Sequence, residues 1–374
     1  MSRCRCWLVV LGCAAILTGA VGPPSFIPPR LGKKELSAHV DEFVAGNASV
    51  ERCAELARAL RANNGKPLAS LVLAAVKNPA TCARALALAA DVPIVGATKE
   101  LKKLVDSEHE AKVIAAILNS GDKEAESFVI DRWSRATPAT PSYAALCTAL
   151  QEYPLSAKAV GELHSSLKKP AKGVDRSTEL RAVLGAQMGL SAAELERLNS
   201  DWKDLLAQFT LKTQTFPSAG HDLLRDASWE RGMGDEKAAD RVRRFREKFL
   251  LEPGGILRLP GITMQDFILK VWMLPLEGDG ATVSVLMKGN SGVGPRLADG
   301  KWQSTAESIR QAIPPAAHGQ WAEVVFSLAG SNLAVAVNGT TIMQTNLYGS
   351  SCNGIHVASG DKGRMLLGGV DLTQ

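Results

Sequence analysis

The chain has 374 residues, of which 46% are hydrophobic and 22% are charged, and this composition excludes an intrinsically disordered chain and a multi-spanning membrane protein. At about 100–200 residues per domain, the length predicts two or three domains with sizeable cores. The formal net charge of +5 is small, and the sequence lacks the basic tract of a nucleic-acid binder, so we expect no nucleic-acid partner.

The first thirty residues predict export. Two arginines precede the apolar run Trp7–Ala20, which ends in small residues suited to cleavage. The run is about 14 residues, shorter than the roughly 20 that a spanning helix needs. We therefore expect a signal peptide over 1–20, a proline-rich linker over 21–34 and a mature chain without a stable membrane span, in the periplasm, at the cell surface or secreted. An uncleaved anchor and a lipoprotein modified at Cys13 are the alternatives.

Four cysteines follow the predicted signal: Cys53, Cys82, Cys147 and Cys352. None belongs to a CxxC pair or lies near a histidine at zinc-ligand spacing, so we expect no metal site and no cofactor. Cys53 and Cys82 fall on neighbouring predicted helices, where an oxidising compartment would allow a disulfide between them. The alternative is that all four thiols act as small buried hydrophobes.

From 35 to 251 the sequence predicts an irregular α-helical array. Segments of about 11–16 residues rich in Ala, Leu, Glu, Lys and Arg alternate with short turns, and Ser49, Pro141 and Ser191 stand where helices would start. The rhythm resembles that of HEAT-like helical arrays, while a single irregular bundle is the alternative. The last predicted helix, through 237–251, is basic and amphipathic, and we expect its apolar side to pack on the array or the domain that follows.

From 252 to 374 the sequence becomes rich in glycine and β-branched residues and predicts an antiparallel β-sandwich or jelly roll. Alternating runs are separated by turn pairs such as Asn338-Gly339, a strong hairpin signal. About eight short strands without helices between them are typical of such folds. The predicted strands are Gly255–Leu259, Asp266–Met273, Ala281–Lys288, Trp321–Leu328, Asn332–Val337, Thr340–Gln344, Gly354–Ala358 and Met365–Leu372.

Three segments of this region carry a family resemblance. They are the run GQWAEVV at 319–325, the stretch LAGSNLAVAVNGTTI at 328–342, and Gly354-Ile355-His356-Val357. Together they resemble the C-terminal half of a concanavalin A-like lectin/glucanase sandwich, most closely of the 3-keto-disaccharide hydrolase type. The resemblance implies a jelly roll whose concave face is lined by polar side chains.

The polar positions depart from that family's pattern. Ala322 and Ala358 stand where the family carries amide side chains, and only Ser284 and Lys288 match polar positions of its central strand. Sugar hydroxyls favour amide and guanidinium donors, so these departures weaken the implied hydrolytic activity more than the implied fold.

The sequence predicts binding residues and no catalytic ones. A glycosidase needs two carboxyl groups about 5–10 Å apart, and no E-x-D-x-x-E strand is present. Trp302 is predicted to lie in a loop, where its ring could stack on a sugar. The other candidate binding residues are Lys288, Arg296 and Asp299 near that loop, and Glu323 on the face of Trp321.

The leading hypothesis is an exported, non-catalytic binding protein. Its sandwich would recognise a glycan or a cell-envelope protein, and the helical array would present it. The first alternative is a secreted carbohydrate-active hydrolase of the 3-keto-disaccharide hydrolase type. The second is a purely structural protein-interaction module. The sequence predicts no particular oligomeric state.

Overall fold

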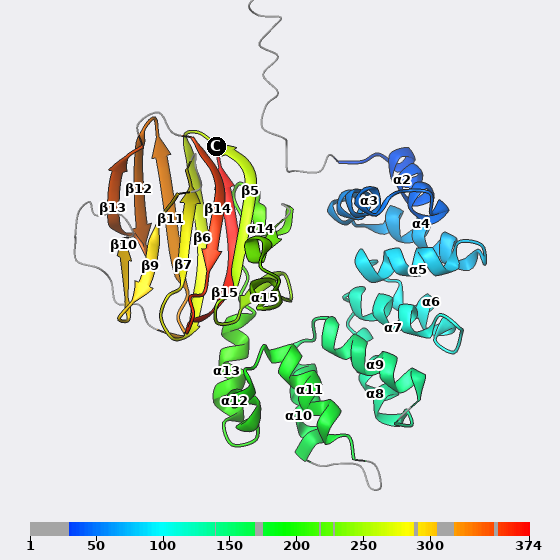
Figure 1. The fold of residues 1–374 in the computed structure, drawn as a ribbon. Helices are drawn as coiled ribbons and strands as arrows, with labels where there is room; N and C mark the ends of the chain where they lie inside the picture. The colour runs from blue at the N-terminus through cyan, green and yellow to red at the C-terminus, as the bar shows by residue number, and fades with distance from the viewer. Residues whose placement is uncertain are drawn as a thin grey trace, which may run out of the picture.

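The computed structural model describes residues 30–138, 140–168, 175–216, 218–226, 229–287, 291–304, 318–347 and 351–374. These residues form an N-terminal helical region followed by an antiparallel β-sandwich, as predicted (Figure 1). The predicted signal peptide and most of the predicted linker lie outside the described residues. Among the helices that are described, none is long and apolar enough to cross a membrane.

The helical region starts at Lys33, slightly before the predicted 35, and local sequence signals set its helix starts. Ser49 accepts a hydrogen bond from the backbone N–H of Arg52, and Ser191 forms a capping box with Glu194. The helices are α2 (Lys33–Ala45), α3 (Val50–Ala62), α4 (Lys66–Lys77), α5 (Cys82–Asp91), α6 (Thr98–Leu101), the 3₁₀ helix η1 (Lys102–Leu104), α7 (Glu110–Asn119), α8 (Ala125–Arg135), α9 (Pro141–Glu152), α10 (Ala157–Lys168), α11 (Ser177–Met188), α12 (Ala192–Glu196) and α13 (Trp202–Lys212).

These helices stack as an array rather than around one bundle axis. Contacts run from α4 to α5, α7, α9 and α11 in turn, and α2 packs on α4 and α5. Leu60, Leu86 and Ile117 are fully buried along the shared core. The array therefore extends beside the sandwich and meets it at its C-terminal end (Figure 1).

The sandwich consists of two antiparallel sheets. In the described residues, sheet A has the order β13-β12-β11-β6-β15-β4-β3 with β1 against β15, and sheet B has the order β10-β9-β7-β14-β5-β2 with β8 against β7. Their facing sides share one core, to which sheet A contributes Val271 and Phe326 and sheet B contributes Val285 and Val357.

The strands of the C-terminal part agree closely with the predicted ranges, and β8, β9 and β10 were not predicted. The strands are β1 (His221–Asp222), β2 (Glu230–Arg231), β3 (Val242–Phe245), β4 (Lys248–Leu251), β5 (Ile256–Met264), β6 (Phe267–Glu277), β7 (Thr282–Leu286), β8 (Gly292–Val293), β9 (Pro295–Ala298), β10 (Lys301–Ser304), β11 (Ala322–Ala329), β12 (Asn332–Val337), β13 (Thr340–Asn346), β14 (Cys352–Ala358) and β15 (Arg364–Thr373). Short helical pieces α14 (Leu223–Asp226), η2 (Gly232–Gly234) and α15 (Glu236–Asp240) lie between the early strands.

The predicted basic helix over 237–251 is wrong beyond α15. The residues that follow form the β3–β4 hairpin, which turns at Arg246 in a left-handed conformation with φ 58°. Phe249 faces the sandwich core, whereas Phe245 and Leu250 face the helical core. All four residues of β4 are buried, and its apolar residues alternate between the two cores. The resulting spacing of apolar residues resembles that of one face of an amphipathic helix.

The predicted domain boundary at 251/252 is wrong for the same reason. The last array helix ends at Lys212, and β1, β3 and β4 pair within sheet A. The sandwich therefore starts well before 252. The tip of the β3–β4 hairpin reaches the array, where the Arg246 guanidinium donates to the carbonyl oxygen of Leu155.

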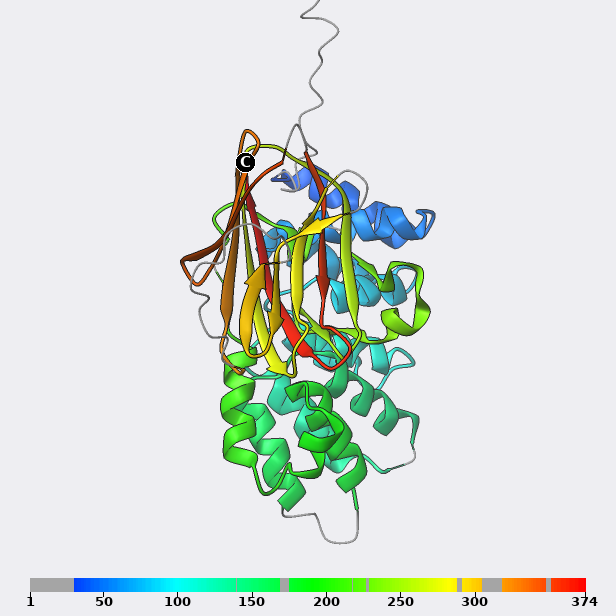
Figure 2. The same ribbon diagram turned by 60° about the vertical axis from the view of Figure 1, so that its left-hand side comes forward.

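A buried charge network joins the array to sheet A. Arg364 of β15 is 2% exposed and contacts Glu194 of α12 at 2.8 Å, Glu252 at 3.0 Å and the carbonyl oxygen of Gly189 at 2.6 Å. Lys212, at the end of α13, donates to the same carbonyl oxygen at 3.1 Å. Sheet A is thus held against the array, and sheet B forms the layer on the far side (Figure 2).

Candidate functional site

The outer face of sheet B carries a row of polar side chains. Strand register places Arg258 of β5 opposite His356 of β14, and His356 opposite Ser284 of β7. The chain neighbours of all three lie in the sandwich core. Because side chains alternate along a strand, Arg258, His356 and Ser284 share the outer face.

A second polar row lies beside the first. Thr282 of β7 pairs with Arg296 of β9, and Arg296 pairs with Gln303 of β10. Arg296 is exposed, and Thr282 and Gln303 are half-buried. Glu230 of β2 stands opposite Arg258 at the edge of the face. The face thus offers guanidinium, imidazole, amide and hydroxyl groups on neighbouring strands, which can donate to and accept from a polyhydroxylated ligand.

The imidazole of His356 is held neutral at physiological pH. Burial, and secondly the adjacent Arg258 guanidinium, lower the pKa of His356 below its usual 6.5. A neutral imidazole presents one donor and one acceptor nitrogen. Ser284 is 6% exposed, and Gly292 of β8 packs against it so closely that a Cβ there would lie 3.0 Å from the Ser284 Cβ.

The prediction that Trp302 contacts a ligand from a loop is wrong. Trp302 lies in β10 opposite Leu297, and its side chain is 1% exposed inside the sandwich core. The expected loop is a tight β9–β10 turn, with Asp299 left-handed at φ 51°. Because β10 already begins at Lys301, Trp302 is a strand residue, and its side chain points into the sandwich core.

The other predicted binding residues do not form one site. Arg296 points outward from sheet B, while Asp299 lies in the β9–β10 turn and donates its backbone N–H to Asp279 at 3.0 Å. Glu323 lies on the opposite side of the sandwich, on the outer face of sheet A beside Trp272. Lys288 lies outside the described residues.

The predicted pairing of Cys53 and Cys82 is not formed. Both are free, half-buried thiols, whereas Cys147 and Cys352 are buried. Burial raises the pKa of Cys352 to about 11, so this thiol is not a reactive one. Within the described part of the chain, no group of His, Cys, Asp and Glu side chains could hold a metal ion.

Neither Arg258 nor His356 was among the predicted binding residues. Each alternates with core residues of its own strand, which is the signal that places both on an outer face. Their adjacency depends on the pairing of β5 with β14, whose positions lie far apart in the chain.

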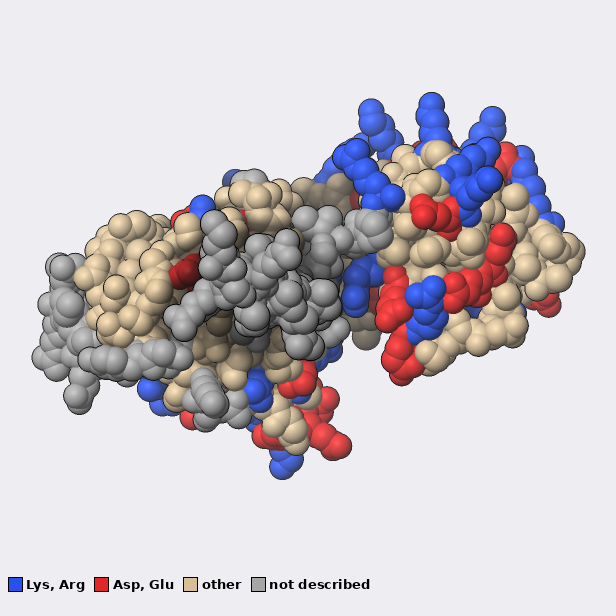
Figure 3. Space-filling view, turned by 90° about the horizontal axis from the view of Figure 1, so that it is seen from above, with Lys and Arg blue, Asp and Glu red and all other residues tan. Residues whose placement is uncertain are grey.

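Charged side chains of both signs gather over the N-terminal helices of the array, on the right in Figure 3. Arg52 there pairs with Glu42 at 2.8 Å and with Glu55 at 3.2 Å. Mixed, mutually paired charges do not make the single-sign surface that a polyanion would need.

Comparison with known proteins gives only distant structural likenesses. No protein-family model and no curated protein matches the chain. A sialidase shares 12% identity over 42% of this chain and 18% of its own, with a TM-score of 0.33. A carbohydrate-binding module from Bacillus subtilis shares 11% identity over 42% of this chain and 100% of its own, with a TM-score of 0.30.

A non-specific endo-β-1,3(4)-glucanase shares 12% identity over 44% of this chain and 92% of its own, with a TM-score of 0.31. The chain thus spans less than a fifth of the sialidase. At such identities and TM-scores, none of these likenesses assigns an activity to this protein. The resemblance to 3-keto-disaccharide hydrolases stays a prediction.

Proposed function

We propose that this protein is a non-catalytic binding protein whose β-sandwich recognises a glycan, or a glycan-bearing envelope partner, through the outer face of sheet B. The observation that carries the proposal is the in-register row Arg258, His356 and Ser284, flanked by Thr282 and Arg296. Charge-assisted and neutral donors in fixed positions suit the closely spaced hydroxyls of a sugar. The predicted signal peptide would place this face outside the cytoplasm.

A hydrolase is the less supported alternative. Glycoside hydrolysis requires two carboxyl groups that flank one bond. Among the described residues in the strands of sheet B, Glu230 is the only carboxylate, and it stands at the edge. One carboxylate without a partner can accept a hydrogen bond from a sugar but supplies no acid–base pair.

A purely structural interaction module draws support from a different observation. The buried contacts of Arg364 hold the sandwich against the array, so that the array could serve as a rigid support. This role is compatible with glycan recognition on the far sheet.

A glycan array followed by calorimetry on the purified chain tests the proposal. We expect Arg258→Ala to weaken binding of a retained glycan at least about tenfold, because a charge-assisted hydrogen bond is lost. Lys270→Ala, on the outer face of sheet A, is the matched control and should leave affinity unchanged. Equal affinity in both variants would refute this face as the site, and product release abolished by Glu230→Gln would favour the hydrolase instead.

A further inference from the structure

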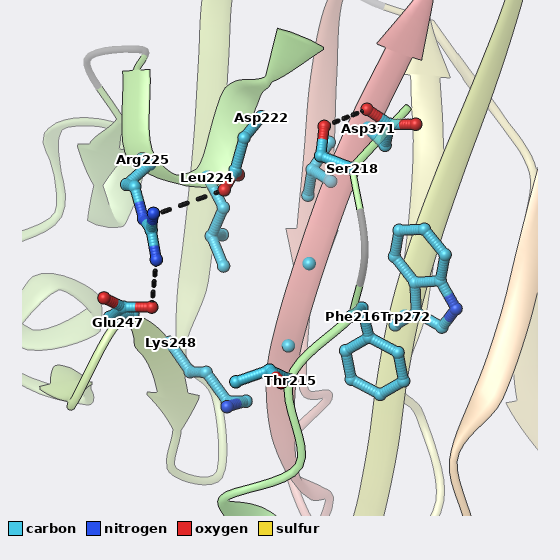
Figure 4. A pocket seen from close by; sticks show the side chains of 13 residues that line it. Thr215, Phe216, Ser218, Asp222, Leu224, Arg225, Glu247, Lys248, Trp272 and Asp371 are labelled. Carbon is cyan, nitrogen blue, oxygen red and sulfur yellow. Dashed lines mark hydrogen bonds and ion pairs between the residues drawn. The ribbon is translucent and has the colours of Figure 1, made fainter. Parts of the chain in front are cut away.

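A pocket lies on the outer face of sheet A, beneath residues 215–216 and 218–225, between the array and the sandwich strands (Figure 4). Its volume is about 70 Å³, and β4, β6 and β15 form the wall opposite these residues. A cavity of about 10–15 Å³ on this scale accommodates one water molecule, so the pocket has room for a small group of several heavy atoms. It is separate from the polar face of sheet B.

One wall of the pocket is aromatic. The Phe216 ring stacks on Trp272 with centroids 5.1 Å apart and an angle of 14° between the rings, and its edge meets Trp321. The backbone of Gly369 lies directly against this wall, since a Cβ there would come within 2.9 Å of the Trp272 ring. The wall therefore presents flat apolar surface to whatever enters the pocket.

Most charges around the pocket already have partners. Asp371 is 3% exposed and accepts hydrogen bonds from the backbone N–H of Ala219 at 3.2 Å and of Gly220 at 3.0 Å, and from the Ser218 hydroxyl. Arg225 pairs with Glu247 and lies 3.8 Å from Asp222. Figure 4 shows the Ser218–Asp371 hydrogen bond and the contacts of Arg225 with Asp222 and Glu247 at the pocket.

Lys248 differs from these residues. Its side chain lines the pocket and is 4% exposed, yet within the described residues its ammonium has no hydrogen bond and no ion pair. Burying an unpaired ammonium is costly, and burial lowers the pKa of Lys248 to about 8. Glu247 attracts this ammonium, whereas the guanidinium groups of Arg246 and Arg225 repel it. The carboxylates of Asp222 and Asp371 also line the pocket, but Asp371 already accepts three hydrogen bonds and Asp222 lies beside Arg225.

We propose that this pocket binds a carboxylate group, of a small organic acid or of an acidic sugar, with the Lys248 ammonium as its ion-pair partner. The pocket has room for the two oxygens of a carboxylate, and Phe216 and Trp272 would cover the carbon atoms that follow. Such a ligand supplies the partner that Lys248 lacks, which is the physical reason for the affinity.

Calorimetric titration of the purified chain tests the proposal, with sodium acetate in one arm and sodium glucuronate in the other, each against sodium chloride at equal ionic strength. We expect saturable binding of at least one carboxylate and at least about tenfold weaker binding in Lys248→Met, because the charge-assisted contact is lost. Lys301→Met, which changes an exposed lysine of β10, is the matched control and should bind as the unmodified chain does.

A second variant guards against misfolding of the first. Thr215 is exposed at the pocket rim, so Thr215→Phe should fold and obstruct the pocket while Lys248 stays in place. Tighter binding of glucuronate would identify an acidic sugar, and equal or tighter binding of acetate a free organic acid. Binding of neither anion, or binding unchanged in both variants, would overturn the proposal. Arg258→Ala tests only the binding of neutral glycans on sheet B. Failure of the glycan proposal and failure of the carboxylate proposal can therefore be told apart.

Discussion

The two outer faces of the sandwich have opposite environments, although both belong to strands with the same alternation. On sheet A the outward residues Leu250, Leu274 and Leu366 join the core of the helical array. On sheet B, the layer away from the array in Figure 2, the outward residues at the centre are Arg258, His356 and Ser284. One outer face therefore attaches the sandwich to the array, and the binding role that we propose belongs to the other face.

Removing the charge that joins sheet A to the array should have the largest effect. Arg364→Met would leave the buried Glu194 with only Lys212 at 3.8 Å and the half-buried Glu252 with only Arg243 at 3.3 Å, and breaking such a buried network costs about 3–5 kcal/mol. We expect the midpoint of urea unfolding to fall and array and sandwich to unfold in separate transitions. Arg296→Met, an exposed arginine of sheet B, should change stability by no more than about 0.5 kcal/mol. Equal midpoints in the two variants would contradict the attachment.

A substitution in the core between the two sheets tests whether Trp302 is a core residue or a ligand-binding residue. Trp302→Ala removes a side chain that is 1% exposed, and the cavity should cost about 3–5 kcal/mol in the free energy of unfolding. Glycan affinity measured on the folded fraction should not change. Lost affinity at unchanged stability would restore the ligand role predicted from the sequence.

The aromatic packing on sheet A can be disturbed with a single methyl group. A Cβ at Gly368 would lie 2.4 Å from the Trp321 ring, so Gly368→Ala must displace that ring and should cost about 1–3 kcal/mol. Gly161→Ala in α10 has nothing within 4 Å of the added Cβ and should stabilise its helix by up to about 1 kcal/mol. Thermal unfolding measures the melting temperature of both variants. A shift of the same sign in the two would contradict the close contact between Gly368 and Trp321.

The smallest expected effect is a pH dependence on sheet B. Because the folded pKa of His356 is lowered from 6.5, the unfolded chain binds more protons at this residue, and stability falls as pH drops below about 6.5. His356→Gln should therefore lose less stability than the unmodified chain between about pH 7 and 5. Parallel melting-temperature curves over this range would show that His356 is not held neutral by its surroundings.

Local sequence signals determined most of the secondary structure. Ser49 and Ser191 cap helices, and Asn338-Gly339 closes the β12–β13 hairpin, because each acts on hydrogen bonds within a few residues. The longer strands after 252 were predictable for the same reason, since alternation is visible in the strand itself, whereas β8, β9 and β10, of two to four residues each, were not predicted. These signals were sufficient for the order of an α-helical region followed by an antiparallel sandwich.

The tertiary structure alone decided which of these side chains meet. The residues after α15 form a hairpin because Phe245 and Phe249 enter different cores, and no local rule distinguishes that from a helix stripe. The sequence predicted both Trp302 and Arg296 as ligand contacts. The pairing of β9 with β10 points Trp302 into the core and Arg296 outward. Arg258 meets His356, and Lys248 lines one pocket with Phe216, through the packing of segments distant in the chain, which only the folded molecule contains.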